Sequence, residues 1–180
     1  MKVTETKLQG CFLIEPTIFG DERGYFFESF NEQEFYKKTG IDVSFVQDNQ
    51  SFSNKGVLRG LHFQKGEFSQ AKLVRVIKGK VLDVAVDLRA NSSTFGEYYS
   101  VVLSEENKKQ LFVPRGFAHG FAVLEDETIF TYKCDNYYHK NAESGIMYND
   151  PTLQIDWMLL ESEIKLSKKD KTLPFLREKE

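Results

Sequence analysis

Side-chain polarity alternates with a period of two along residues 72–88, KLVRVIKGKVLDVAVDL, and this pattern limits the fold strongly. In its second half, one face of an extended chain would carry Leu82, Val84, Val86 and Leu88, and the other Val81, Asp83, Ala85 and Asp87. Because successive side chains of a strand point to opposite faces, the pattern predicts β-strands and not an amphipathic helix. Lys78-Gly79 lies between two such runs and predicts a turn of the hairpin type.

Short apolar runs of the same kind recur along the chain: YYSVVLS (98–104), QLFVP (110–114), FAHGFAVL (117–124) and TIFTYKC (128–134). Turn-forming residues separate them, and short strands at this spacing favour an all-β sandwich or barrel closed on itself. Helical signals are few. Asn31 as N-cap and Gly40 as helix end predict one short peripheral helix, and a further turn is expected at Ser167. No repeat or linker divides the sequence, so residues 1–180 are expected to form one domain.

Composition disfavours several classes of protein. The formal net charge is −3 and no basic stripe is present, which argues against nucleic-acid binding. No stretch approaches the roughly 18 apolar residues of a membrane span, and the N-terminus lacks the apolar segment of a signal peptide. Cys11 and Cys134 have no metal-binding spacing and are expected to be small buried residues or free thiols in a reducing compartment. We therefore expect a cytoplasmic protein.

Three histidines are the candidates for chemistry: His62, His119 and His139. Metal-binding β-barrels often use a His-x-His pair, but the residue two before His62 is Gly60, so we expect no metal. Imidazole gains and loses a proton near neutral pH, which leaves proton transfer as the chemical role. A histidine satisfied in the core is the plain alternative, but Arg59 and Lys72 near His62 favour a site for an anionic substrate.

The geometry of that site depends on two further features. Strict alternation would put Arg59 and His62 on opposite faces, unless Gly60 accommodates a β-bulge that turns both inward. Tyr132 shares a strand face with Phe130 and Cys134, where a tyrosine is more often a core residue than a catalyst. On an apolar face, His119 would need a buried polar partner, and Asp83 is the candidate.

Several long motifs follow one another along the chain: FGDERGYFFES (19–29), FVQDNQS (45–51), VLRGLHFQ (57–64), KLVRVIKGKVLDVAVDLR (72–89), SSTFG (92–96), ENKKQLFVPRGFAHGF (106–121), YKCDNYY (132–138) and LSKKD (166–170). Together and in this order they resemble the dTDP-4-dehydrorhamnose 3,5-epimerase family. The resemblance implies a cupin-type jelly roll, usually a homodimer. It also implies that dTDP-4-dehydro-6-deoxy-D-glucose is epimerised at C3 and C5 without a metal or organic cofactor, in dTDP-L-rhamnose biosynthesis.

The resemblance also implies roles for residues at matching positions. His62 matches the general base, Asp170 its carboxylate partner, Tyr132 the general acid, and Lys72 the cation beside the sugar ketone. Arg59 and His119 match positions that line the substrate pocket, and Tyr138 matches the aromatic residue stacked on thymine. Positions that bind the nucleotide and diphosphate are matched by Arg23, Glu28, Gln47, Asp48 and Asn49. Two further binding positions are matched by Glu143 and Lys169. Met158 follows Trp157 where members of the family often have proline, and the spacing to Lys169 and Asp170 varies among them.

The expected chemistry explains why these residue types are needed. A ketone at C4 acidifies the hydrogens at C3 and C5, because the carbanion delocalises onto the ketone oxygen. Epimerisation then needs a base and an acid on opposite faces of the ring, with positive charge beside the enolate. Three alternatives stay open on the sequence. One is an epimerase acting at C3 or C5 only, or on a related dTDP-4-keto-6-deoxy sugar. The others are a cupin that binds a sugar nucleotide without catalysis, and a metal-dependent cupin oxygenase or isomerase, which the missing ligands disfavour.

Overall fold

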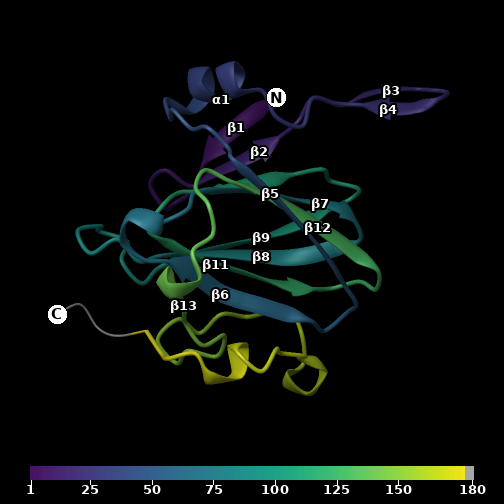
Figure 1. The fold of residues 1–180 in the computed structure, drawn as a ribbon. Helices are drawn as coiled ribbons and strands as arrows, with labels where there is room; N and C mark the ends of the chain where they lie inside the picture. The colour runs from purple at the N-terminus through teal and green to yellow at the C-terminus, as the bar shows by residue number, and fades with distance from the viewer. Residues whose placement is uncertain (177–180) are drawn as a thin grey trace.

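The computed structural model, described here for residues 1–176, consists of two antiparallel sheets packed face to face (Figure 1). Within these residues the first sheet has six strands, in the order β1 (Lys2–Glu5), β2 (Phe12–Glu15), β10 (Gln110–Val113), β7 (Lys72–Lys78), β12 (Thr128–Cys134) and β5 (Gln47–Ser53). The second has five, in the order β13 (Glu143–Gly145), β6 (Leu58–Gln64), β11 (Phe117–Val123), β8 (Lys80–Asp87) and β9 (Tyr98–Ser104). The prediction of an all-β, jelly-roll-type fold is confirmed.

Several smaller elements are added to these two sheets. Strands β3 (Phe19–Asp21) and β4 (Gly24–Phe26) form a separate hairpin that projects away from the body of the molecule (Figure 1). The remaining elements are α1 (Glu32–Thr39) and the short 3₁₀ helices η1 (Gly66–Phe68), η2 (Lys140–Ala142), η3 (Glu161–Glu163) and η4 (Asp170–Thr172).

The predicted helix caps are confirmed in α1. Asn31 Oδ1 accepts a hydrogen bond from the backbone N–H of Glu34 at 3.1 Å, which satisfies one of the free donors at the helix start. Gly40 ends the helix with a φ of 71°, and its N–H donates to the carbonyl of Tyr36. The helix buries Phe35 against Phe112 on the outer side of the six-stranded sheet.

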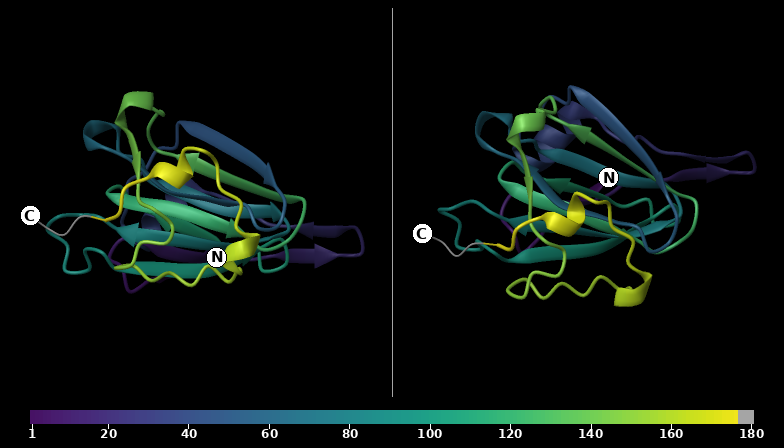
Figure 2. Two further views of the ribbon diagram at one scale, coloured as in Figure 1. Left: turned by 90° about the horizontal axis from the view of Figure 1, so that it is seen from below. Right: turned by 60° about the horizontal axis from the view of Figure 1, so that its bottom comes forward.

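The alternation of strand β8 is confirmed, and both of its faces are buried. Val81 and Ala85 belong to the core between the sheets, whereas Leu82, Val84 and Val86 pack on the opposite side of the five-stranded sheet. Residues 146–176 cross that opposite side and cover it, as the yellow-green part of the chain shows in Figure 2. This C-terminal covering segment brings Trp157 against the sheet and carries η4 to the edge of β6.

The turn predicted at Lys78-Gly79 exists, but the hairpin does not. Gly79 has a φ of 80°, which only glycine adopts readily, and a Cβ there would lie 2.3 Å from Thr128 Oγ1. The strands on its two sides enter different sheets: β7 pairs with β10 and β12, and β8 with β9 and β11. The turn is therefore a corner between the sheets, because both strands find their partners elsewhere in the chain.

Candidate active site

The irregularity predicted at Gly60 is present and shapes the site. His119 is paired with His62 and Phe121 with Arg59, so three steps along β6 face two steps along β11. Gly60 has a φ of 116°, and a Cβ at this position would lie 2.6 Å from the Cα of Gly120. Only glycine allows the two backbones to approach so closely. As a result, Arg59 and His62 line the same cavity.

This cavity, which we call the central cavity, has a volume of about 580 Å³ and lies between the two sheets. Of the residues singled out in the sequence, it is lined by Asn49, Arg59, His62, Lys72, His119, Tyr132, Lys169 and Asp170. A smaller neighbouring cavity of about 150 Å³ shares Asn49, His62, Lys72 and Tyr132 and adds Gln47, Tyr138 and Glu143. The fold therefore collects most of the predicted residues around two adjoining cavities, although they come from β5, β6, β7, β11, β12, β13, the loop before β13 and the C-terminal covering segment.

His62 is paired with a carboxylate from the far end of the sequence. Its Nε2 lies 2.6 Å from Oδ1 of Asp170, which is almost fully buried in η4. The backbone N–H of Asp170 donates to Ser167 Oγ at 3.1 Å, as the turn expected at Ser167 implies. Lys165 bonds to Gly56 and Leu58 through its backbone and anchors the segment beside β6.

The pKa of Asp170 reflects two opposing effects. Burial alone would raise it and is the largest single influence, but the hydrogen bond and charge of His62, with the Ser167 hydrogen bond and the nearby Lys169, outweigh burial. The pKa of this carboxyl therefore lies below its ordinary value, and Asp170 is ionised throughout the neutral range. An ionised carboxylate at this distance fixes the orientation of the imidazole and stabilises its protonated form.

Tyr132 and Lys72 face His62 from the opposite sheet. They lie on the paired strands β12 and β7, and the Lys72 ammonium is 5.7 Å from the centre of the Tyr132 ring. Burial raises the pKa of the Tyr132 phenol, so it keeps its proton at neutral pH. Burial lowers the pKa of Lys72, and the negative charges of Asp83 and Glu143 partly offset this effect. An acid and a cation thus share one wall, and the His62–Asp170 pair forms the other.

A second imidazole–carboxylate pair lies deeper in the sandwich. Nε2 of His119 is 2.8 Å from Oδ1 of Asp83, which is fully buried, so the predicted partnership is confirmed. The other Asp83 oxygen, Oδ2, is buried without a hydrogen-bond partner among residues 1–176. Arg59 is held by Ser53, whose Oγ accepts from Nε and Nη2 at 3.3 and 3.1 Å. Ser53 was not predicted, although alternation along β5 places it on the same face as Asn49.

Tyr138 stands at the mouth of the cavity with half of its surface exposed. Its hydroxyl donates to Glu143 Oε2 at 2.9 Å, and Glu143 is also ion-paired with Lys169. Burial tends to raise the pKa of Glu143, but the bonds from Lys169 and Tyr138 lower it overall. Gln47 Oε1 accepts from the backbone N–H of Tyr138, and Gln47 Nε2 donates to Asn49.

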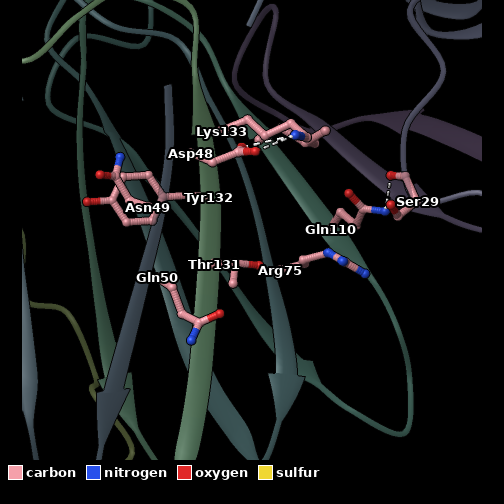
Figure 3. A pocket seen from close by; sticks show the side chains of 10 residues that line it. Ser29, Asp48, Asn49, Gln50, Arg75, Gln110, Thr131, Tyr132 and Lys133 are labelled. Atoms are coloured by element: carbon pink, nitrogen blue, oxygen red, sulfur yellow. Dashed lines mark hydrogen bonds and ion pairs between the residues drawn. The ribbon is translucent and has the colours of Figure 1, made fainter. Parts of the chain in front are cut away.

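Asp48 lies on the other side of the six-stranded sheet. A pocket of about 320 Å³ lies there. In Figure 3, Asp48 is bonded to Lys133, while the ring of Tyr132 and the amide of Asn49 lie on the opposite side of β12. The Asp48–Lys133 distance is 2.9 Å. Arg75 also lines this pocket, and burial lowers its pKa.

Arg23 and Glu28 are not brought to the cavity of their own chain. Arg23 is in the turn of the β3–β4 hairpin, where its side chain is 85% exposed and bonds to Asp21. Glu28 Oε2 accepts a hydrogen bond from Asn31 at the start of α1.

Three further expectations from the sequence concern the cysteines, metal binding and membrane spans. Cys11 and Cys134 are buried free thiols, as predicted. Within residues 1–176 no cluster of three or more His, Cys, Asp or Glu side chains is arranged to hold a metal ion, and independence from metals stays a prediction. In the same part of the chain, no helix has the length and apolar character needed to cross a membrane.

Known proteins resemble this chain over nearly its whole length. Residues 5–178 match the family model of dTDP-4-dehydrorhamnose 3,5-epimerase. The chain is 53% identical to the dTDP-4-dehydrorhamnose 3,5-epimerase of Methanothermobacter thermautotrophicus, over 97% of this chain and 94% of the relative. The crystal structure of the enzyme of that name from Elizabethkingia anophelis matches with a TM-score of 0.94 at 55% identity, covering 97% of this chain and 96% of that one.

A second solved structure carries a sugar nucleotide. It is a dTDP-6-deoxy-D-glucose-3,5-epimerase from Legionella pneumophila in complex with dTDP-4-keto-L-rhamnose, with a TM-score of 0.93 and 50% identity over 97% of this chain and 92% of that one. The resemblance inferred from the sequence motifs is therefore confirmed. The chain belongs to the dTDP-4-dehydrorhamnose 3,5-epimerase family.

Proposed function

We propose that this chain epimerises dTDP-4-dehydro-6-deoxy-D-glucose at C3 and C5 to give dTDP-4-dehydro-L-rhamnose, for dTDP-L-rhamnose biosynthesis, with His62 as base and Tyr132 as acid. One observation carries the assignment of roles. The His62–Asp170 pair and the protonated Tyr132 project into one cavity from facing sheets. A sugar ring held between them would have a base on one face and an acid on the other, as inversion of a carbon requires.

Proton abstraction follows from the His62–Asp170 contact. With the Nε2–H group donating to Asp170, the lone pair of the imidazole is on Nδ1, which removes the proton beside the ketone. The C–H bond breaks, and its electron pair delocalises onto the C4 oxygen as an enolate. The protonated imidazole is then stabilised by the carboxylate of Asp170. The Lys72 ammonium is the cation on the opposite wall that would stabilise the enolate oxygen.

Tyr132 completes the inversion. Its phenolic proton is delivered to the carbanion from the face opposite His62, so the new C–H bond has the inverted configuration. After the first inversion the imidazolium returns its proton to solvent and the phenolate takes one up, so that the same two groups can act once at C3 and once at C5. Arg59 and His119 would hold sugar or phosphate oxygens, and Gln47, Asn49, Glu143 and Lys169 surround the route toward the nucleotide. Tyr138 would stack on the thymine ring at the cavity mouth.

A homodimer would account for Arg23 and Glu28, which lie outside the cavity of their own chain. The β3–β4 hairpin exposes Phe19, Tyr25 and Phe26 by 63, 60 and 70%, an apolar surface that monomers seldom leave open. A partner chain would cover it, and Arg23 and Glu28 would then act on a nucleotide in the partner's cavity. Light scattering tests the dimer, and substitution of Phe19 and Phe26 by serine should shift the mass toward the monomer.

Residues 1–180 would act as one domain, because the catalytic pair joins β6 to the C-terminal segment. The two free thiols are consistent with a cytoplasmic enzyme.

The test is an NMR assay of the purified protein with dTDP-4-dehydro-6-deoxy-D-glucose in deuterated water. A double epimerase should introduce deuterium at both C3 and C5 of the product. Label at one carbon only would make the chain a mono-epimerase. Binding without any label would make it a non-catalytic sugar-nucleotide-binding protein.

A further inference from the structure

The loop that carries Tyr138, residues 135–142, is fixed along its length by amide side chains. At its start, Asn136 Nδ2 donates to the carbonyl of Glu67 at 2.9 Å, and Gln70 Nε2 donates to the carbonyl of Asn136 at 2.8 Å. These bonds tie the loop to the connection between β6 and β7. A connecting loop with half-exposed side chains would otherwise sample many conformations, and ordering those side chains when a ligand binds would weaken the binding.

Three strands hold the residues around the Tyr138 ring. The backbone N–H of Tyr138 donates to Gln47 Oε1 of β5, and its hydroxyl donates to Glu143 Oε2 of β13. The backbone N–H of His139 donates to Gln64 Oε1 of β6 at 3.0 Å, and Gln64 Nε2 lies 3.5 Å from the carbonyl of Tyr137. Gln64 thus contacts the backbone on both sides of Tyr138.

Gln64 differs from the other contacts in its burial and its place on the strand. Its side chain is only 7% exposed, so its hydrogen bonds to the loop are shielded from competing water. It also lies two residues after His62 on β6, on the same face of the strand. One strand therefore sets the position of the catalytic imidazole and that of the Tyr138 loop.

A ring contact reinforces this arrangement. The rings of Phe68 and His139 are stacked, with centroids 4.0 Å apart and planes at 15°. Phe68 belongs to η1, which follows β6 directly, so this contact also ties the loop to the end of the strand that carries His62 and Gln64.

We propose that Gln64 is a positioning residue for nucleotide recognition: it holds the backbone around Tyr138 so that the ring is already placed to stack on the pyrimidine base, at a fixed distance from His62. The role rests on the proposed function of Tyr138. Gln64 itself does not touch the substrate. Its contribution is preorganisation of the loop before the nucleotide arrives, which improves affinity without a new contact.

The test compares Gln64→Met, Tyr138→Ala and the double variant for binding of dTDP by calorimetry. Gln64→Met keeps the length of the side chain and removes both hydrogen bonds. We expect it to weaken dTDP binding about tenfold, which corresponds to the cost of ordering one or two side chains. In the Tyr138→Ala background the same change should alter binding by less than about twofold, because the ring that Gln64 positions is absent. Equal losses in both backgrounds would overturn the proposal.

Two further measurements separate positioning from a general loss of structure. Hydrogen exchange should be faster in peptides covering residues 135–142 of Gln64→Met and unchanged elsewhere, and unaltered protection of that loop would contradict the proposal. KM for the sugar nucleotide should rise with dTDP Kd, with kcat much less affected. Gln64→Asn keeps the amide but is one carbon too short to reach His139, so it should reproduce the loss with a polar side chain in place.

Failure of this proposal is distinguishable from failure of the proposed function, because dTDP binding needs no turnover. Normal dTDP affinity in Tyr138→Ala, in a protein whose wild type epimerises the substrate, would overturn the role of Gln64 and leave the epimerase assignment intact. A wild type that binds dTDP through Tyr138 and Gln64 but labels no carbon would overturn the epimerase assignment and leave the role of Gln64 intact.

Discussion

Nε2 of His62 lies 2.6 Å from Oδ1 of Asp170, although 108 residues separate them in the sequence. The contact joins β6 of the five-stranded sheet to the C-terminal covering segment. It depends on backbone bonds of Lys165 to Gly56 and Leu58. The catalytic base is therefore complete only when the last part of the chain has packed against the sheet.

Asp170→Asn should change how activity depends on pH. The pKa of Asp170 is lowered in the folded protein, so its charge is present throughout the neutral range. A neutral amide no longer stabilises the imidazolium form of His62, so the base stays unprotonated to lower pH. The acidic limb of the pH–rate profile should move to lower pH, with a reduced maximal rate. Asp42→Asn, at an exposed carboxylate, is the control and should leave the profile unchanged.

If Asp170→Asn and Asp42→Asn gave the same profile as the wild type, the carboxylate of Asp170 would have no electrostatic role in catalysis.

Lys72 should set the alkaline limb of activity. Burial lowers its pKa below the ordinary 10.5 of lysine, whereas burial raises the pKa of Tyr132. Burial therefore moves the loss of the ammonium proton to lower pH and that of the phenol proton to higher pH, and we expect stabilisation of the enolate to be lost first. In Lys72→Arg the guanidinium stays charged, so any remaining activity should lack this limb. Lys80→Arg, at a surface ion pair with Glu125, is the matched control.

An alkaline limb that persists unchanged in Lys72→Arg would assign it to another group, with Tyr132 the first to examine.

Asp87 should stabilise the folded state in a pH-dependent way. Burial would raise its pKa, but bonds from Arg89, Ser92 and Thr94 outweigh burial and lower it from 3.8 to about 2. This difference is worth about 2 kcal/mol of stability at neutral pH. Because the folded-state pKa is the lower one, the stabilisation is present above pH 3.8 and is lost as pH falls toward 2. Urea unfolding of wild type and Asp87→Asn should show a difference that narrows below about pH 4. A difference that is constant with pH would mean that the charge of Asp87 contributes nothing.

Local patterns in the sequence predicted much of the fold. Alternation along β8 gave the buried faces on both of its sides, and the residue types at Asn31 and Gly40 gave the ends of α1. Gly60 indicated a bulge because glycine alone tolerates the backbone approach found there. These features depend on neighbours in the sequence, which is why they were predictable.

Features that depend on residues far away in the sequence were harder to predict. Gly79 would mark a turn both in a hairpin and in a corner between two sheets. The pairing of β7 and β8 with other strands is what makes it a corner. Gln64 and Ser53 are polar residues on strands with no local signal of function, because the groups they hold lie elsewhere in the chain. The predicted roles of Arg23 and Glu28 came from the resemblance alone, and their own chain leaves them far from the cavity.

The central claim is that His62 removes the proton and Tyr132 returns one from the opposite face. Removal of the base in His62→Ala should lower turnover roughly 10²–10⁴-fold, the usual contribution of one acid–base group, and should abolish exchange of the substrate hydrogens with solvent. Tyr132→Phe should behave differently, because the base is intact and only proton delivery from the opposite face is lost. The carbanion would then be reprotonated mostly by the imidazolium, on the face from which the proton left.

The most direct measurement is the ratio of exchange to epimerisation in deuterated water, followed by NMR for wild type and Tyr132→Phe. The account predicts that Tyr132→Phe incorporates deuterium into recovered substrate faster than it forms epimerised product, so that the ratio rises above that of the wild type. A Tyr132→Phe variant with near-native turnover, or one that loses exchange and product together, would contradict the assignment of Tyr132 as the acid.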